Sequence, residues 1–410
     1  MLRLVPRNPR ILIYSHDSFG LGHLRRCRAI AHGLVGAWSE LTVLILSGSP
    51  IIGSFDFRSR VDFVRIPGVI KLRNGEYTSL SLHLDTEHTL QIRASIIEHT
   101  AEVFAPDIFI VDKEPLGLRG EVRPTLELLR DQGTHLVLGL RDVLDDADAL
   151  HEEWLRKDSY PALEEFYDDV WVYGVKSVHD PLDGLAVSDC VRDRTRYTGY
   201  LQRSAPQDIH SVEPIPFDEG SYLLVTPGGG GDGIELVDWV MRAYETAGHD
   251  LMPAVIVLGP FMDPEHQAAF LARAEGMSNI HMLRFTPHIE PLMIGAAGIV
   301  GMGGYNIFCE ILSFDRPTLL VPRVIPRREQ SIRASRAAEA GLLTVLPIDH
   351  RETVSLMVDA LKRLPRQAPP SSAGLHGLMG GLDAIIDRVG DVLSDRAAKL
   401  RPQDQQVHSG

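Results

Sequence analysis

Two residues in the first part of the chain have types and positions that suit proton transfer. His23 follows the glycine loop from Gly20 to Gly22 and begins a segment, Leu24 to Leu34, whose apolar residues repeat with helical spacing. The positive end of a helix dipole lowers the pKa of an imidazole and favours its neutral, basic form. Asp112 ends the apolar run from Pro106 to Val111, where its carboxylate could orient His23 or accept a proton. A simpler interpretation of each residue is a cap for the helix or turn that follows it.

Two glycine-rich turns in the second half of the chain are suited to binding phosphate. The run Gly228 to Gly231 lies between an apolar strand and a helix, and Gly303 and Gly304 precede a helix from Tyr305 to Phe314. Backbone N–H groups at the start of a helix bind phosphate, and glycine permits close approach of the backbone to a ligand. The polyglycine run lacks the Lys-Ser or Lys-Thr ending of a P-loop, so ATP hydrolysis is disfavoured. Such turns also occur in any doubly wound fold.

Three polar residues accompany the second glycine turn. Glu310 lies about one and a half turns into the helix, where a carboxylate suits a pair of ribose hydroxyls. Glu329 and Gln330 end the polar loop that follows the apolar strand from Thr318 to Val321. Ligands collect at the carboxyl ends of strands in an open α/β sheet, so these side chains are expected to converge on one crevice with Gly304. In the simpler interpretation, Glu310 is a solvated helix residue.

Apolar runs and helical segments alternate along the whole chain, which predicts an α/β fold with parallel sheets. At 410 residues the chain suits two domains, and the proline-rich and acidic stretch from Ser204 to Gly220 is the predicted boundary. The polar segment from Gly75 to Thr89 shows no periodicity and is predicted to be a loop able to cover an acceptor.

Composition excludes several classes of function. The net charge of −14 argues against nonspecific binding of nucleic acid. The three cysteines lie far apart, so no disulfide framework or zinc site is predicted, and they are expected to be buried. No apolar run is long enough to span a membrane, and no signal peptide precedes the first strand, which predicts a cytoplasmic protein. Leu21, Leu24, Val69 and Ile70 could form a membrane-facing patch, although such residues are more often core.

The pattern around the second glycine turn resembles the donor half of MurG-type glycosyltransferases of family 28. It comprises the glycine pair with Asn306 and Glu310, the strand bounded by Pro317 and Pro322, and the pair Glu329-Gln330. The resemblance implies the GT-B fold, which is two facing Rossmann-like domains with doubly wound parallel sheets and a final helix that crosses back. It also implies that Glu310 holds the nucleotide ribose and that Glu329 and Gln330 read the sugar. The family commonly has two glutamines at that pair, so the sugar stays open.

The first loop, GLGHLRRC, resembles the acceptor loop of the same family and, more closely, the loop of the UDP-sugar hydrolase of pseudaminic acid synthesis. The histidine of that hydrolase is catalytic, and His23 occupies the matching position. Arg203 matches an arginine that approaches the donor where the chain crosses between domains. Phe285 matches a residue that covers the base of the nucleotide. The simpler interpretations are an exposed linker arginine and a core aromatic residue.

The resemblance also implies a domain plan. Residues 1–203 form an acceptor-side domain, 204–220 a linker, 221–366 a donor domain, 367–400 a linker with the returning helix, and 401–410 a disordered tail. The predicted catalytic residues are His23 and Asp112. The predicted donor-binding residues are Gly20, Gly22, Arg203, Gly228, Gly229, Gly230, Phe285, Gly303, Gly304, Asn306, Glu310, Glu329 and Gln330.

The predicted activity is transfer of a sugar, such as an N-acetylhexosamine, from a UDP-sugar to an acceptor hydroxyl with inversion. No cofactor is predicted, and no metal, because the donor half has no Asp-x-Asp-like carboxylate pair at a strand end. The acceptor is open, with a lipid-linked or polymer-linked alcohol and peripheral contact with the inner membrane face as options. The alternatives are a nucleotide-sugar hydrolase with His23 as the base, a noncatalytic nucleotide-sugar-binding regulator, and a sugar-nucleotide epimerase.

Overall fold

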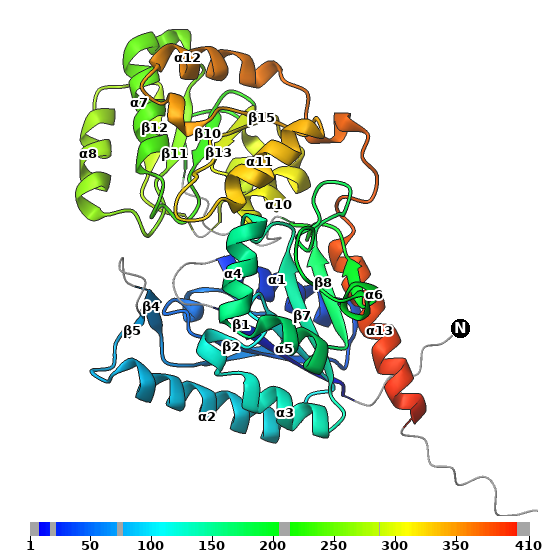
Figure 1. The fold of residues 1–410 in the computed structure, drawn as a ribbon. Helices are drawn as coiled ribbons and strands as arrows, with labels where there is room; N and C mark the ends of the chain where they lie inside the picture. Colours follow the sequence, from blue (N-terminus) through cyan, green and yellow to red (C-terminus); the bar gives the residue numbers. More distant parts are fainter. Residues whose placement is uncertain (1–7, 17–21, 72–76, 205–213, 287, 400–410) are drawn as a thin grey trace, which may run out of the picture.

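The structure is a computed structural model, and it describes residues 8–16, 22–71, 77–204, 214–286 and 288–399. The described chain forms two domains, each built on a parallel sheet, and the two domains face one another (Figure 1). The predicted α/β class with two doubly wound sheets is therefore confirmed.

The N-terminal sheet has seven parallel strands in the order β3-β2-β1-β6-β7-β8-β9. Their bounds are β1 Arg10–Ser15, β2 Thr42–Ser47, β3 Val61–Arg65, β6 Ile108–Asp112, β7 His135–Arg141, β8 Asp169–Tyr173 and β9 Thr195–Tyr197. The strand order reverses between β1 and β6, which pair directly. A crevice opens outside the carboxyl ends of the strands at such a switch point, and ligands bind there. The segment after β1 and the end of β6 carry the two predicted catalytic residues.

Helices cover both faces of this sheet. Their bounds are α1 Gly22–Ala37, α2 Thr86–Phe104, α3 Arg123–Asp131, α4 Ala147–Arg156, α5 Ser159–Phe166 and α6 Asp189–Asp193. Alternate side chains of β1 lie on opposite faces of the sheet, because successive strand side chains point in opposite directions. Ile11 and Ile13 pack in one apolar core with α1, and Leu12 and Tyr14 pack in the other core with α2 and α3. Burial on both faces explains why the strands appear in the sequence as continuous apolar runs.

The C-terminal sheet has six parallel strands in the order β12-β11-β10-β13-β14-β15. Their bounds are β10 Leu223–Thr226, β11 Ala254–Val257, β12 Ile280–Leu283, β13 Gly298–Gly301, β14 Thr318–Leu320 and β15 Thr344–Val345. The flanking helices are α7 Ile234–Ala247, α8 Pro264–Ala274, α9 Glu290–Gly295, α10 Tyr305–Phe314, α11 Glu329–Glu339 and α12 Val354–Arg363. The order reverses between β10 and β13, and both glycine turns follow these two strands.

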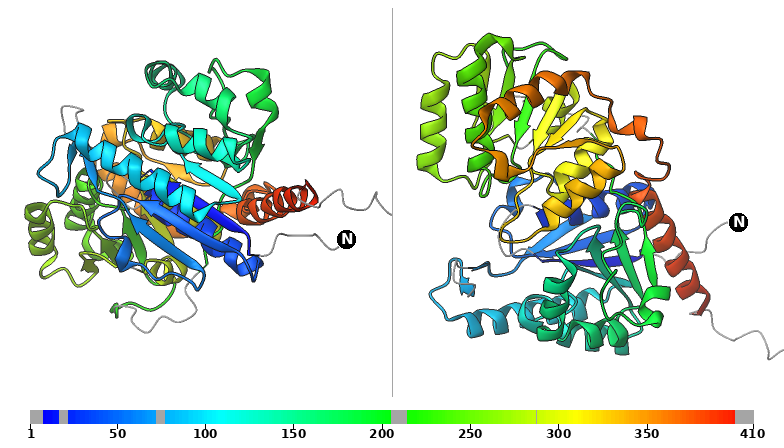
Figure 2. Two further views of the ribbon diagram at one scale, coloured as in Figure 1. Left: turned by 90° about the horizontal axis from the view of Figure 1, so that it is seen from below. Right: turned by 45° about the horizontal axis from the view of Figure 1, so that its top comes forward.

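Helix α13 (Gly381–Lys399) returns from the C-terminal domain and packs along the N-terminal domain against α1 (Figures 1 and 2). Arg388 of α13 donates to Asp169 at the start of β8 at 2.7 Å. The chain crosses between the domains twice, near Tyr200 and again near Gly381, and the two crossings lie side by side. The N–H of Tyr200 donates to Leu378 O at 2.7 Å, and that of Gly381 donates to Tyr200 O at 3.1 Å. The remaining elements are short 3₁₀ helices at Ile52–Ser54, Leu118–Gly120, Gly248–Asp250, Ile348–His350, Leu364–Arg366 and Pro370–Ala373.

The prediction of a loop from Gly75 to Thr89 is wrong in part. Strand β5 (Tyr77–Ser79) pairs antiparallel with β4 (Val69–Lys71). Helix α2 begins three residues earlier than predicted, at Thr86, because the Asp85 side chain accepts a hydrogen bond from the N–H of His88 at 2.8 Å and caps the helix.

Two predictions about exposure are also wrong in part. Leu24 and Val69 are completely buried and cannot face a membrane, and Leu21 lies outside the described residues. Cys27 and Cys309 are buried as predicted, but Cys190 is exposed. No helix among the described residues combines the length and the apolar character that a membrane span requires.

Candidate active site

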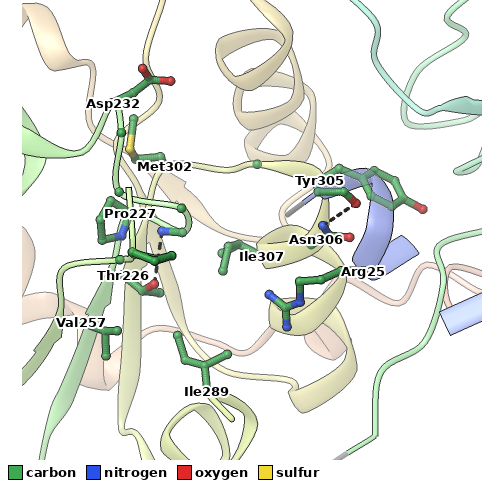
Figure 3. A pocket seen from close by; sticks show the side chains of 18 of the residues that line it. Arg25, Thr226, Pro227, Asp232, Val257, Ile289, Met302, Tyr305, Asn306 and Ile307 are labelled. Carbon is green, nitrogen blue, oxygen red and sulfur yellow. Dashed lines mark hydrogen bonds between the residues drawn. The ribbon is translucent and has the colours of Figure 1, made fainter. Parts of the chain in front are cut away.

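The two domains enclose a pocket of about 290 Å³ that both switch points border. In Figure 3, Thr226 and Pro227 of the C-terminal sheet lie across this pocket from Arg25 of α1. The predicted residues that line it are Gly22, His23, Gly228, Gly229, Gly230, Phe285, Gly304, Asn306, Glu329 and Gln330. The structure thus brings together residues from five separate segments.

His23 lies against a buried ion pair. Its Nδ1 is 2.5 Å from Asp112 Oδ2, and Arg26, one turn further along α1, donates to Asp112 Oδ1 from Nε at 2.9 Å and from Nη2 at 2.6 Å. Burial raises the pKa of Asp112, but Arg26 and His23 outweigh this effect and hold the pKa well below its usual range. Asp112 is therefore an acceptor, so Nδ1 of His23 carries the proton and Nε2 keeps a free lone pair. This arrangement favours the predicted role of Asp112 in orienting His23.

The environment keeps His23 neutral. Burial lowers the pKa of its imidazole from 6.5, the neighbouring Asp112 offsets part of this shift, and Arg26 and Lys113 add to it. A neutral imidazole with a fixed tautomer is a general base at neutral pH.

We expect the pH dependence of the rate to report this arrangement. The acidic limb of kcat/KM should lie below 6.5, the ordinary pKa of histidine, because the base must be unprotonated. Asp112→Asn removes the carboxylate that raises the pKa of His23 and leaves Arg26 unpaired. The acidic limb of this variant should move to lower pH, which a profile from about pH 4 to pH 9 measures. A limb that moves to higher pH would contradict the assignment of His23 as the base.

The polyglycine turn packs closely against the loop that follows β11. Gly230 has a φ of +88°, and a Cβ atom placed there would lie 2.4 Å from Leu258 O. Glycine is required at this position because other residues avoid this backbone conformation and the space is filled. The turn ends at Gly231, two residues before Gly233, the N-cap of α7, so its N–H groups lie just before the N-terminus of that helix.

Gly230→Ala should distort the turn and weaken the binding of its ligand. The forced backbone conformation costs about 1–3 kcal/mol, and we expect lower nucleotide affinity together with a lower unfolding temperature. Gly231→Ala is the matched control, since the nearest atom to its Cβ, Phe261 O, lies 3.8 Å away. Calorimetric titration with UDP and thermal unfolding measure both effects, and equal effects of the two variants would contradict the close packing of Gly230.

Glu310 is completely buried and does not line the pocket. Its Oε1 accepts a hydrogen bond from Arg25 Nη2 at 2.5 Å across the domain interface, and its Oε2 has no hydrogen-bond partner among the described residues. Burial raises the pKa of Glu310, and Arg25 offsets part of this shift. The interpretation of Glu310 as a solvated helix residue is therefore wrong.

Arg203, Gly303 and Asn306 also connect segments at the interface. Arg203 Nη2 donates to Asn306 Oδ1 at 3.0 Å, and Asn306 Nδ2 donates to Gly22 O at 3.0 Å. The carbonyl of Gly303 accepts a hydrogen bond from Arg333 Nη1 at 2.9 Å. Arg203 and Gly303 do not line the pocket, and Gly20 lies outside the described residues.

The remaining predicted donor residues, Phe285 and the pair Glu329-Gln330, belong to the C-terminal domain and line the pocket. Glu329 and Gln330 form the first turn of α11, so the prediction of a polar loop at this pair is wrong. Glu329 is buried and accepts a hydrogen bond from Arg323 Nη2 at 2.7 Å. Phe285 is 41% exposed, which rules out its interpretation as a core aromatic residue.

Sequence reasoning missed three arginines of the site. Arg25 and Arg26 follow the first glycine loop directly in the sequence, but their carboxylate partners lie 285 and 86 positions away along the chain. Arg141 ends β7 and lines the pocket. Its position at the carboxyl end of a predicted parallel strand could have indicated that it belongs to the site. Among the described residues, no group of three or more His, Cys, Asp or Glu side chains is arranged to hold a metal ion.

No protein-family model matches the chain, and no curated protein shows detectable sequence similarity to it. Solved structures do match. The glycotransferase of kitacinnamycin is 16% identical with a TM-score of 0.62, and the alignment covers 96% of this chain and 99% of that protein. MurG of Acinetobacter baumannii is 13% identical with a TM-score of 0.59, covering 93% and 99%.

The fold is GT-B. A third GT-B structure, UGT2 of Phytolacca americana with UDP-2-fluoro-glucose and pterostilbene, is 15% identical with a TM-score of 0.58 and coverage of 97% and 96%. The resemblance that the two loop motifs suggested is thus confirmed at the level of the fold. Similarity this distant establishes the GT-B architecture alone.

Proposed function

We propose that this GT-B protein is a glycosyltransferase that moves a sugar from a nucleoside diphosphate sugar to an acceptor hydroxyl with inversion and without a metal ion. The observation that carries the proposal is the oriented neutral base, His23 with Asp112 and Arg26, in one pocket with a glycine turn at a helix N-terminus. A base on one side and a phosphate cradle on the other are what single displacement at an anomeric carbon requires.

The donor fits the C-terminal wall of the pocket. The diphosphate would accept hydrogen bonds from the N–H groups of the turn Gly228 to Gly231 and of Gly304, which lie at the starts of α7 and α10. The sugar would lie near Glu329 and Gln330, and the nucleobase of the donor would lie against Phe285. The bound UDP-2-fluoro-glucose of the UGT2 structure supports uridine diphosphate as the nucleotide.

Glu310 is proposed to hold the ribose. Its Oε2 is a buried acceptor without a donor, and an unsatisfied buried acceptor costs about 1–3 kcal/mol. A ribose hydroxyl that reaches Oε2 would supply the missing hydrogen bond. Because Glu310 lies behind the pocket lining, this contact requires the two domains to move apart locally when the donor enters.

The reaction would proceed in one displacement. Nε2 of His23 takes the proton of the acceptor hydroxyl, and the hydroxyl oxygen attacks the anomeric carbon as the bond from that carbon to the diphosphate breaks. The N–H groups of the glycine turns would stabilise the charge on the departing diphosphate. Asp112 stabilises the imidazolium that forms, because its carboxylate is already ionised and in contact with Nδ1.

The test begins with binding. Titration of the protein with UDP, GDP, ADP and dTDP should identify one preferred nucleotide, and Glu310→Gln should weaken its affinity about tenfold to a hundredfold. Glu290→Gln is the matched control, because Glu290 lies 3.4 Å from the same Arg25 but lines a different pocket, on the side of α1 that carries Arg28 and His32. The corresponding sugar nucleotide should then be consumed in an acceptor-dependent reaction.

Two outcomes would overturn the proposal. Failure of every nucleotide to bind would remove the donor site. Rapid nucleotide release without an acceptor that depends on His23 would show a hydrolase rather than a transferase.

A further inference from the structure

Arg141 lies at the same sheet edge as the proposed base. Strands β6 and β7 are neighbours, with Asp112 paired to Gly139, so Arg141 stands two residues beyond the level of Asp112 on the adjoining strand. It lines the pocket together with His23. Arg141 therefore belongs to the wall contributed by the N-terminal domain, whereas the glycine turns form the opposite wall.

The guanidinium of Arg141 is unpaired. Within the described part of the chain it makes no hydrogen bond or ion pair, and its Nε is shielded from solvent. Other arginines around it have carboxylate partners. Arg26 binds Asp112, Arg333 binds Asp142 at 2.6 Å, and Arg323 binds Glu329 at 2.7 Å. Among the described residues, Asp112, Asp142 and Glu329 each already pair with another arginine, so Arg141 adds a further positive charge to the pocket.

Keeping a cation in this position is unfavourable for the protein alone. Burial lowers the pKa of Arg141 to about 10, Glu329 offsets part of this shift, and Arg26 and Arg333 add to it. The side chain remains charged at neutral pH, so the cost of removing it from water is not avoided by losing its proton. Arg141 is half-buried, and a partly desolvated charge without a partner is unfavourable unless a ligand supplies the counterion.

We propose that Arg141 binds a phosphate or carboxylate group carried by the acceptor, so that the acceptor is an anionic alcohol. This inference rests on the proposed function and names the class of its second substrate. The acceptor, rather than the donor, is indicated because Arg141 shares its wall with His23, which would take the proton of the acceptor. The donor diphosphate already has the N–H groups of the glycine turns on the other wall.

The chemistry of the guanidinium supports an oxyanion. Its planar fork of donors matches the two oxygens of a carboxylate or phosphate, and such paired hydrogen bonds fix orientation as well as adding affinity. An acceptor without the anion would leave Arg141 unpaired in the closed pocket. Arg141 would therefore select against neutral alcohols.

The test uses binding rather than turnover. Wild-type protein saturated with UDP is titrated with inorganic phosphate, with glycerol 3-phosphate and with glycerol. We expect the two phosphates to bind and glycerol not to bind. Arg141→Gln should weaken phosphate binding about tenfold or more, Arg141→Lys should retain part of it, and UDP affinity should stay within about twofold in both variants.

The control is Arg58→Gln, which makes the same charge change. Arg58 is an exposed arginine in a separate pocket of about 540 Å³ and should leave phosphate binding unchanged. Thermal unfolding provides a second readout, because removing an unpaired cation should leave Arg141→Gln at least as stable as the wild type.

Three outcomes would overturn the proposal: failure of both phosphates to bind the UDP complex, equal loss in Arg141→Gln and Arg58→Gln, or a loss of UDP affinity in Arg141→Gln. The last outcome would assign Arg141 to the donor. Failure of the wild type to bind any nucleotide would instead refute the proposed function, and phosphate binding to the free protein would still report on Arg141.

Discussion

Replacing His23 with alanine should lower kcat/KM for sugar transfer by about 10² to 10⁴-fold and leave nucleotide affinity within about twofold. The reason is that the imidazole would act on the acceptor proton, while the proposed contacts to the nucleotide come from the other domain. Asp112 and Arg26 remain paired without His23, so the variant should stay folded. Initial rates and calorimetric titration with the preferred nucleotide separate the two effects.

His32→Ala is the matched control for this measurement. His32 lies on the same helix, and burial together with Arg28 and Arg58 lowers its pKa to about 4, but it does not line the proposed active site. It should therefore retain nearly full activity. Equal losses in His23→Ala and His32→Ala, or full activity in His23→Ala, would contradict the assignment of His23 as the base.

Replacing Arg333 with methionine should destabilise the protein by about 3–5 kcal/mol. Arg333 is completely buried, and it donates to Asp142 from Nε at 2.8 Å and from Nη2 at 2.6 Å. The variant leaves the Asp142 carboxylate buried without its main counterion, and the carbonyl of Gly303 loses its donor as well. Urea-induced unfolding measures the free energy lost.

Two variants test whether the loss comes from the uncompensated charge. Arg336→Met changes an exposed arginine of the same helix, whose ion pair with Glu339 spans 2.9 Å, and should cost less than about 1 kcal/mol. Adding Asp142→Leu to Arg333→Met should restore part of the lost stability, because the double variant buries no lone carboxylate. A double variant as unstable as the sum of the single changes would indicate that lost packing, not charge, causes the effect.

The sequence predicted the strands of both sheets well because burial on both faces produces continuous apolar runs. The apolar run from Thr318 to Val321 corresponds to β14 (Thr318–Leu320), and the run from Pro106 to Val111 corresponds to β6 (Ile108–Asp112). Glycine turns between strand and helix marked both switch points, because the chain must turn sharply there. The general position of the site therefore followed from local patterns.

Contacts between distant segments could not be predicted in this way. The pairs Arg25–Glu310 and Arg333–Asp142 join residues 285 and 191 positions apart, and no local pattern encodes which charged side chains will meet across an interface. Arg141 has no ion-pair partner among the described residues because Asp112, Asp142 and Glu329 pair with other arginines, which the local sequence does not indicate either. Helix α11 begins at Glu329 and includes a pair predicted to lie in a loop, because the helix has few large apolar residues and its apolar periodicity is therefore weak.

The two adjacent crossings of the chain have a mechanical consequence. A Cβ atom at Gly381 would lie 2.5 Å from Gly199 O, so the two connecting segments touch where they pass between the domains. Two covalent connections joined at one place act as a hinge, and they restrict relative movement of the domains to rotation about that place. The displacement produced by a given rotation grows with distance from the hinge. The rim of the pocket farthest from the crossings should therefore open most, which makes it the natural entrance for both substrates.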